Sequence, residues 1–164
     1  MAGGEPTDGA EIENAPFDAD FATLKLYANE AEDLTIVASV LQDSVVRRSE
    51  LTYLALSLTF AGVFSRYRWE ADRGGGERVR AGLRFRGVLS VQSRDLASRV
   101  ADNVLEFLTI QADTGEDGAG SVTLLFSGGE AIRLATECID CEISAIGTPW
   151  LAARRPAHPI VDEG

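Results

Sequence analysis

Residues 78–86, RVRAGLRFR, alternate arginine with apolar side chains at a period of two. Because an extended strand places residues i and i+2 on the same face, this run predicts a strand with Arg78, Arg80, Arg84 and Arg86 on one side. The other side then carries Val, Ala, Leu and Phe toward a core. A strand of this kind belongs in a sheet that exposes one face to water and covers the other.

One amphipathic helix is expected before this strand. Apolar residues recur at steps of three and four within residues 30–46, as on one face of a helix. Asn29 offers an N-cap, and Glu32 three residues later would complete a capping box. The stripe consists of Leu34, Val37, Leu41 and Val45.

The remainder of the chain reads as consecutive strands. The hairpin signal SGGE joins two alternating runs at residues 127–130. Consecutive strands favour an antiparallel sheet over βαβ units. We therefore predict an α+β fold, with a bent antiparallel sheet of about seven strands (a half-barrel or pleckstrin-like sandwich) and one amphipathic helix near the N-terminus. The expected strands cover residues 23–28, 52–57, 58–70, 78–93, 103–112, 121–127 and 130–137.

The chain divides into a tail, one domain and an arm. Residues 1–15 are acidic and rich in glycine, which predicts a disordered tail, and residues 16–147 form a single α+β domain. Prolines in residues 148–164 predict an extended C-terminal arm. The first 20 residues carry six carboxylates and no base, unlike a signal or transit peptide. No run approaches the ~18 apolar residues of a membrane span, so we expect a cytoplasmic protein without membrane contact.

Charge is distributed unevenly. The chain carries 26 acidic and 15 basic residues, a net charge of −11, which disfavours polyanions at long range. Segment 66–99 nevertheless holds nine arginines and four acids. If residues 58–70 pair with the arginine strand, Arg66 and Arg68 would join Arg80 and Arg84 on one surface. That surface is either a solvated face balanced by cross-strand acids or a binding surface for an anionic partner.

Cys138 and Cys141 form a C-x-x-C spacing. The alternation slips by one residue between them, which predicts a β-bulge with both side chains inward. A disulfide is disfavoured, because three extended residues span about 10 Å and bridged Cα atoms lie within about 7 Å. Neighbouring carboxylates disfavour a reactive thiolate. The only histidine is His158, in the arm, so we expect buried cysteines and no metal, with a metal shared across a homodimer left open.

No catalytic motif is present: P-loop, GxGxxG, GxSxG and HExxH patterns are absent. We therefore expect no catalytic residues and no cofactor. The leading hypothesis is a non-enzymatic cytoplasmic interaction or adaptor module that binds a protein partner through the arginine face and the C-terminal arm. A nucleic-acid or phosphate-ligand binder is the alternative, less favoured because Tyr67, Trp69 and Phe85 are expected on the core side. An enzyme with an unrecognised carboxylate site ranks third. The predicted binding residues are Arg66, Arg68, Arg80, Arg84, Trp150, Arg154 and Arg155.

Four segments together resemble an uncharacterised alphaproteobacterial family with a domain of unknown function, DUF2948. They are LKLYANEAEDLTIVASVLQDSVV, RYRWE followed by the arginine-rich strand, FSGGEAIRLATECIDC, and PWLAARRPAHP. The resemblance covers most of residues 24–158. It implies no known activity, and it favours a cysteine at position 138 without requiring one at 141.

Overall fold

The computed structural model describes residues 24–67, 77–94 and 103–151. These ranges contain eight strands, one short α-helix, α3 (Leu34–Val40), and three single turns of 3-10 helix, η2 (Ala31–Asp33), η3 (Arg48–Glu50) and η4 (Ala55–Ser57). The strands are β1 (Lys25–Ala28), β2 (Val45–Arg47), β3 (Leu51–Leu54), β4 (Thr59–Tyr67), β5 (Glu77–Arg94), β6 (Val104–Thr114), β7 (Gly120–Phe126) and β8 (Ala131–Leu151).

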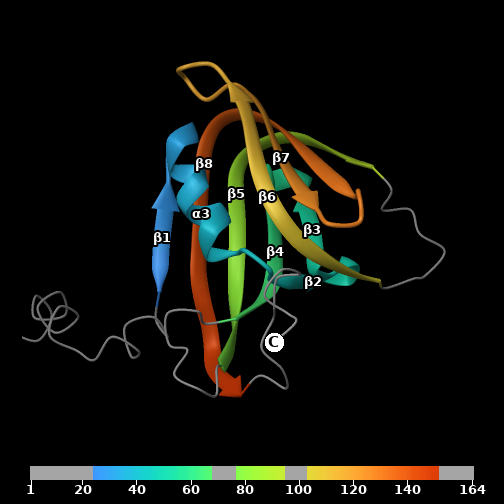
Figure 1. Ribbon diagram of the computed structural model, residues 1–164. Helices are drawn as coiled ribbons and strands as arrows, with labels where there is room; N and C mark the ends of the chain where they lie inside the picture. The colour runs from blue at the N-terminus through green and yellow to red at the C-terminus, as the bar shows by residue number, and fades with distance from the viewer. Residues whose placement is uncertain (1–23, 68–76, 95–102, 152–164) are drawn as a thin grey trace, which may run out of the picture.

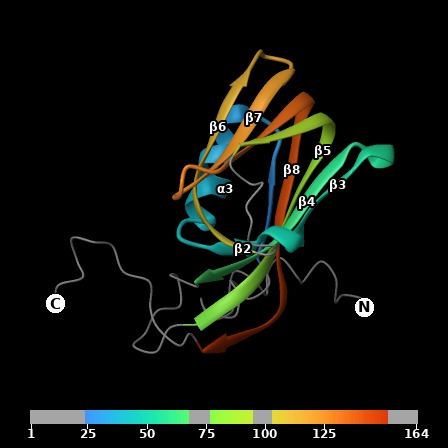
Figure 2. The same cartoon turned by 90° about the vertical axis from the view of Figure 1, so that its right-hand side faces the viewer.

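All strand pairs are antiparallel, and they follow the order β1-β8-β5-β4-β2-β6-β7, with β3 added beside β4. β7 pairs in addition with the first part of β8. Figures 1 and 2 show that the long strands β5 and β8 bend over toward β6 and β7. The sheet is strongly bent but not closed into a barrel, since β2 joins β4 through the single pair Val45 and Ser65. The predicted fold class is confirmed, with eight strands in place of about seven.

The core lies between the inner face of the sheet and α3, which sits between β1 and β6 (Figure 1). Leu34, Val37 and Leu41 of the predicted stripe are each at most 2% exposed. Phe107 of β6 sits at the centre, with edge-to-face ring contacts to Phe64 at 6.2 Å and to Phe126 at 6.3 Å. Such contacts add stabilisation to the burial of the rings.

The helix is shorter than predicted. It ends at Val40, and the valines that were expected to continue it instead begin β2. Asp43 adopts a left-handed conformation, φ 64°, which turns the chain after the helix. The capping prediction is also wrong, because Glu30 is the N-cap of the first helical turn and makes no side-chain cap. The carboxylate of Asp33 accepts a hydrogen bond from the Asn29 N–H at 3.3 Å instead.

The predicted hairpin and bulge are both confirmed. At the tip of the β7–β8 hairpin, the Phe126 N–H donates to the Glu130 carbonyl at 3.0 Å, and Gly129 takes φ 93°. The bulge lies where β5 and β8 bend: Arg86 pairs with Asp140 and Val88 with Thr136, so Gly87 faces residues 137–139 of β8, and the register shifts again after Val88. Gly87 has φ 74° at this point, a conformation that glycine adopts without strain.

Candidate functional site

The first four arginines of β5, Arg78, Arg80, Arg84 and Arg86, share one face of the sheet, as predicted. Arg80 and Arg86 are exposed and Arg84 is partly exposed, whereas the residues between them are buried in the core. Arg78 is more covered, and its guanidinium donates to the Ser65 carbonyl at 3.0 Å. The alternation of burial therefore follows the alternation of residue type. The buried partners are Val79, Ala81, Leu83 and Phe85, each at most 1% exposed.

Glu142 of β8 lies opposite Arg84 in the register and accepts its guanidinium hydrogen bond. The same carboxylate lies 3.5 Å from the Lys25 ammonium on β1. The hydrogen bond from Arg84 is the main reason why the pKa of Glu142 lies below its usual value, and the charges of Arg84 and Lys25 act in the same direction. This triad links β1, β8 and β5 across the face.

Two further carboxylates approach the remaining exposed arginines. Arg80 contacts Glu50 at 3.3 Å, and Arg86 faces Asp140 at 3.9 Å. Arg80, Arg84 and Arg86 thus each have an acidic neighbour, which agrees with the interpretation of a face balanced by cross-strand acids. We call the arginine surface the set Lys25, Glu50, Arg78, Arg80, Arg84, Arg86, Asp140 and Glu142.

Arg66 does not lie on this surface, so the prediction that it joins Arg80 and Arg84 is wrong. In the β4–β5 register Arg66 pairs with Val79, which places it on the core face, where it is 3% exposed. Its Nε–H donates to the Val40 carbonyl, at the end of α3, at 3.0 Å. A cation there satisfies a carbonyl that the helix leaves open and matches the negative end of the helix dipole.

The prediction for Tyr67, the residue after Arg66, is wrong for the same reason. Tyr67 pairs with Arg78 and therefore lies on the outer side of the sheet, although it was expected on the core side. It is only 1% exposed, so it offers no surface for stacking. Phe85 is in the core, as expected, and Trp69 falls outside the described residues.

Other predicted binding residues fall wholly or partly outside the described residues. Arg68, Arg154 and Arg155 lie beyond the described ranges. Trp150 belongs to β8, which continues four residues into the predicted arm, and its backbone pairs with Arg78. β8 ends at Leu151, so the arm begins beside one end of the arginine surface.

Two exposed apolar side chains flank the arginines, and sequence reasoning missed both. Tyr27 of β1 lies opposite Glu142 and is 61% exposed, and Ile146 of β8 lies opposite Arg80 and is 43% exposed. Ile146 lies over Gly82, because a Cβ built on that glycine would be 2.9 Å from the Ile146 Cδ1. The alternation of each strand could have placed Tyr27 and Ile146 on an outer face, but only the register of β1 and β8 shows that they lie beside the arginines.

Cys138 and Cys141 are free thiols, Cys138 within the bulge at residues 137–139 and Cys141 after it. The prediction that both side chains are inward and buried is wrong for Cys138, because the alternation slips before it and the buried residue of the bulge is Ile139. Cys141 is fully buried in the core, and burial, followed by the charges of Asp140 and Glu142, raises its pKa to about 12. Burial also raises the pKa of the half-buried Cys138. Both shifts disfavour the reactive thiolate. Within the described ranges, no three Asp, Glu, Cys or His side chains gather as a metal site would require.

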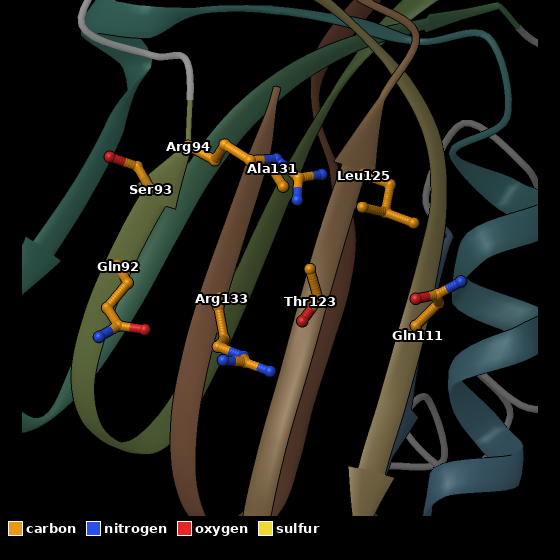
Figure 3. Close-up of a pocket in the computed structure, with 8 residues that line it drawn as sticks. All are labelled: Gln92, Ser93, Arg94, Gln111, Thr123, Leu125, Ala131 and Arg133. Atoms are coloured by element: carbon orange, nitrogen blue, oxygen red, sulfur yellow. The ribbon is translucent and has the colours of Figure 1, made fainter. Parts of the chain in front are cut away.

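A second polar site lies beyond the bulge on the outer face of β5, β8, β7 and β6 (Figure 3). The registers place Gln92 opposite Arg133, Arg133 opposite Thr123, and Thr123 opposite Gln111, so that these four residues form one row across four strands. The row lines a cavity of about 390 Å³. We call this site the polar pocket.

The next row of the polar pocket contains Arg94, Ala131 and Leu125, again on neighbouring strands. Figure 3 shows the side chains of Arg94 and Arg133 on the same side of the sheet, with the small Ala131 beside them. Arg94 donates from Nε to the Gly129 carbonyl at 3.4 Å. Neither arginine has a carboxylate within ion-pair distance among the residues that the structure describes.

The fold and these two sites define a class: a sheet-rich α+β domain whose outer face carries its polar sites, with a packed core behind them. The chain belongs to the family described as Protein of unknown function (DUF2948), which matches residues 24–158. Comparisons with curated proteins and with solved structures give no match. In the part of the chain that the structure covers, no helix has both the length and the hydropathy to cross a bilayer.

Proposed function

We propose that this protein is a non-enzymatic interaction module that binds a protein partner on the arginine surface, with the C-terminal arm as a second contact. The observation that carries the proposal is the pair of exposed apolar side chains, Tyr27 and Ile146, set among arginines. Tyrosine and arginine are enriched at protein interfaces and often dominate their binding energy. The start of the arm beside Arg78 supports a joint contact.

The charge of the arginine surface indicates the chemistry of the partner. It carries five cations and three carboxylates in a chain of net charge −11. A partner segment that combines acidic and apolar side chains would complement this surface. The carboxylates weaken the nucleic-acid alternative, because they already neutralise much of the charge that a phosphate backbone would need.

We also propose a cytoplasmic location. The two free thiols, Cys138 and Cys141, support it, because thiols stay reduced in the cytoplasm.

The test is capture of a partner with matched surface variants. A Tyr27→Ser, Ile146→Ser double variant removes the two apolar groups from the arginine surface. An Ile36→Ser, Leu108→Ser variant is the control, because these side chains are 55% and 56% exposed on α3 and β6, which carry no residue of the arginine surface. We expect a protein captured from a lysate of the source cells by the tagged wild type to be lost only from the first variant.

Cross-linking of the captured complex should connect the partner to β1, β5 or β8. Equal capture by both variants, or cross-links confined to other elements, would refute the proposal. Recovery of nucleic acid that an Arg80→Gln variant no longer binds would favour the alternative instead.

A further inference from the structure

We propose that the polar pocket binds the phosphate group of a small phosphate monoester, with Arg94 and Arg133 as the charged clamp. Gln92, Gln111 and Thr123 would provide neutral hydrogen-bonding groups around it. This inference does not depend on the proposed protein interaction, because the two sites share no residue.

The register brings the two guanidiniums within reach of one anion. Arg94 pairs with Ala131, and Arg133 is two residues farther along the same strand. Such diagonal neighbours on adjacent strands have Cα atoms about 7–8 Å apart, which long side chains bridge easily. Ala131 leaves the space between them open. Both arginines are on paired strand positions, Arg133 within β8 and Arg94 at the last residue of β5, so the register sets where their side chains begin.

Arg94 and Arg133 differ from the arginines of the arginine surface in their ion-pair partners. Arg80, Arg84 and Arg86 each approach a carboxylate. The Arg133 side chain makes no hydrogen bond or ion pair to any residue that the structure describes, and the Arg94 side chain makes one hydrogen bond, through Nε. An external anion therefore displaces no carboxylate of the described residues. Charge-assisted hydrogen bonds from arginine are strong and geometrically specific.

The nearest carboxylate in sequence is turned away. Glu130 precedes Ala131, but its side chain lies over the hairpin turn: a Cβ built on Gly128 would be 2.7 Å from Oε1 of Glu130. In the next row toward the bulge, Ser90, Ala135 and Ser121 occupy the same face of β5, β8 and β7. On β6 the residue in this row is Asp113, opposite Ser121. The clamp is thus bordered by uncharged groups on β5, β8 and β7, and this carboxylate lies on the second strand from Arg133, outside the lining of the pocket.

The lining favours a small phosphate ester over a nucleic acid. The cavity of about 390 Å³ is at the lower end of ligand-sized pockets. Its lining contains no aromatic side chain on which a base could stack. The net charge of −11 also repels long polyanions more than a single phosphate group.

The test is an NMR titration of the full-length protein with inorganic phosphate, at constant ionic strength and with chloride as the balancing anion. We expect saturable shifts of the arginine Nε–H signals of Arg94 and Arg133, with a dissociation constant on the order of 1 mM. A titration with glycerol phosphate should shift the same signals and those of the amides of Gln92 or Gln111. Arg133→Gln and Arg94→Gln should each weaken binding about tenfold or more.

The matched control is Arg86→Gln, which removes the same charge from the same strand but lies near Asp140 on the other side of the bulge. It should leave phosphate binding unchanged. The proposal is wrong if phosphate at tens of millimolar leaves the two arginine signals unmoved, or if Arg86→Gln weakens binding as much as Arg133→Gln. The second result would show that phosphate responds only to the overall charge. Thermal melts of all three variants confirm that each remains folded.

Discussion

Replacing Glu142 with glutamine should show how firmly Arg84 is committed to an internal ion pair. Glu142 accepts the Arg84 hydrogen bond and lies 3.5 Å from the Lys25 ammonium. Glutamine keeps the size and most of the hydrogen-bonding shape of the side chain but removes its charge. The substitution therefore isolates the electrostatic contribution of the triad to the free energy of unfolding.

The exposures of the three side chains set the expected magnitude. The Glu142 side chain is 12% exposed, whereas Arg84 is 42% exposed and Lys25 54%. Exposed pairs contribute about 0–1 kcal/mol, and breaking a buried pair costs about 3–5 kcal/mol. A covered carboxylate between two solvated cations lies between these limits, so we expect a loss of about 1–2 kcal/mol at pH 7. That loss corresponds to a decrease in Tm of about 3–6 °C for a domain of this size.

The pH dependence has a defined sign. Folding lowers the pKa of Glu142, chiefly through the Arg84 hydrogen bond. The stabilisation is therefore fully present above the unfolded pKa of about 4.3 and is lost as the pH falls through the lower folded value. The wild type and Glu142→Gln should differ in unfolding free energy at pH 7 and converge below about pH 3.

Urea unfolding monitored by circular dichroism at pH 7 and at acidic pH measures both effects. A double-mutant cycle with Arg84→Gln should give a coupling energy of about 1 kcal/mol at pH 7. A coupling below about 0.3 kcal/mol, within the usual error of additivity, would refute the reasoning. In that case Arg84 is free to bind an external anion. A difference between the two proteins that persists unchanged at acidic pH would also contradict it.

Three further substitutions or modifications test the core and the bend. Gly87→Ala should lower the free energy of unfolding by about 2–4 kcal/mol, because alanine at φ 74° is strained and its Cβ would lie 2.9 Å from the Cys138 Sγ. In urea unfolding, adding Cys138→Ala to this variant should recover part of the loss. With its pKa of about 12, Cys141 should resist thiol labelling at pH 8 in the native protein and react only after unfolding; labelling as fast as that of Cys138 would show that the bulge opens. Phe107→Leu removes two edge-to-face ring contacts and should lower the free energy of unfolding by about 2–3 kcal/mol, and a loss below 1 kcal/mol would show that the site repacks.

The local features of the fold were predictable because short-range patterns determine them. The alternation of β5 follows from a period of two, and the β7–β8 hairpin follows from its two glycines between apolar runs. The slip in alternation before Cys141 predicted the bulge. In each case the residues that carry the signal are also the residues that make the structure.

Register between strands was harder to predict, and Arg66 shows why. Its assignment to the arginine surface assumed that even-numbered residues of β4 and β5 share a face, but the observed pairs join even to odd. The missed signal was Phe60 and Phe64, which have the same parity as Arg66 and are both in the core. One residue of slip moves a whole strand to the other face. The helix was overestimated for a related reason, since the apolar stripe continues through Val45 although the chain turns at Asp43.

The polar pocket could not be recognised from sequence, because its residues come from four separate strands. Gln111 and Arg133 acquire their relation only when β6, β7 and β8 pair in one register. A polar residue at an outward position is ordinary on any single strand. The site exists as a row across the sheet, and no sequence window contains that row.

The contrast between the two sites shows that arginine density alone does not identify a place for an anion. Segment 66–99 is the most arginine-rich part of the chain, yet its Arg80, Arg84 and Arg86 approach Glu50, Glu142 and Asp140. Arg133 stands alone on its strand, and no carboxylate neutralises it among the described residues. A ligand must displace an internal carboxylate at the first site, whereas no carboxylate of the described residues occupies the second. Because the bulge at Gly87 separates the two regions, substitutions in one should be additive in stability with substitutions in the other. A double variant of Arg84→Gln and Arg133→Gln tests this directly: a sum of the single effects is expected, and a coupling above about 0.5 kcal/mol would show that the outer face acts as one charged surface.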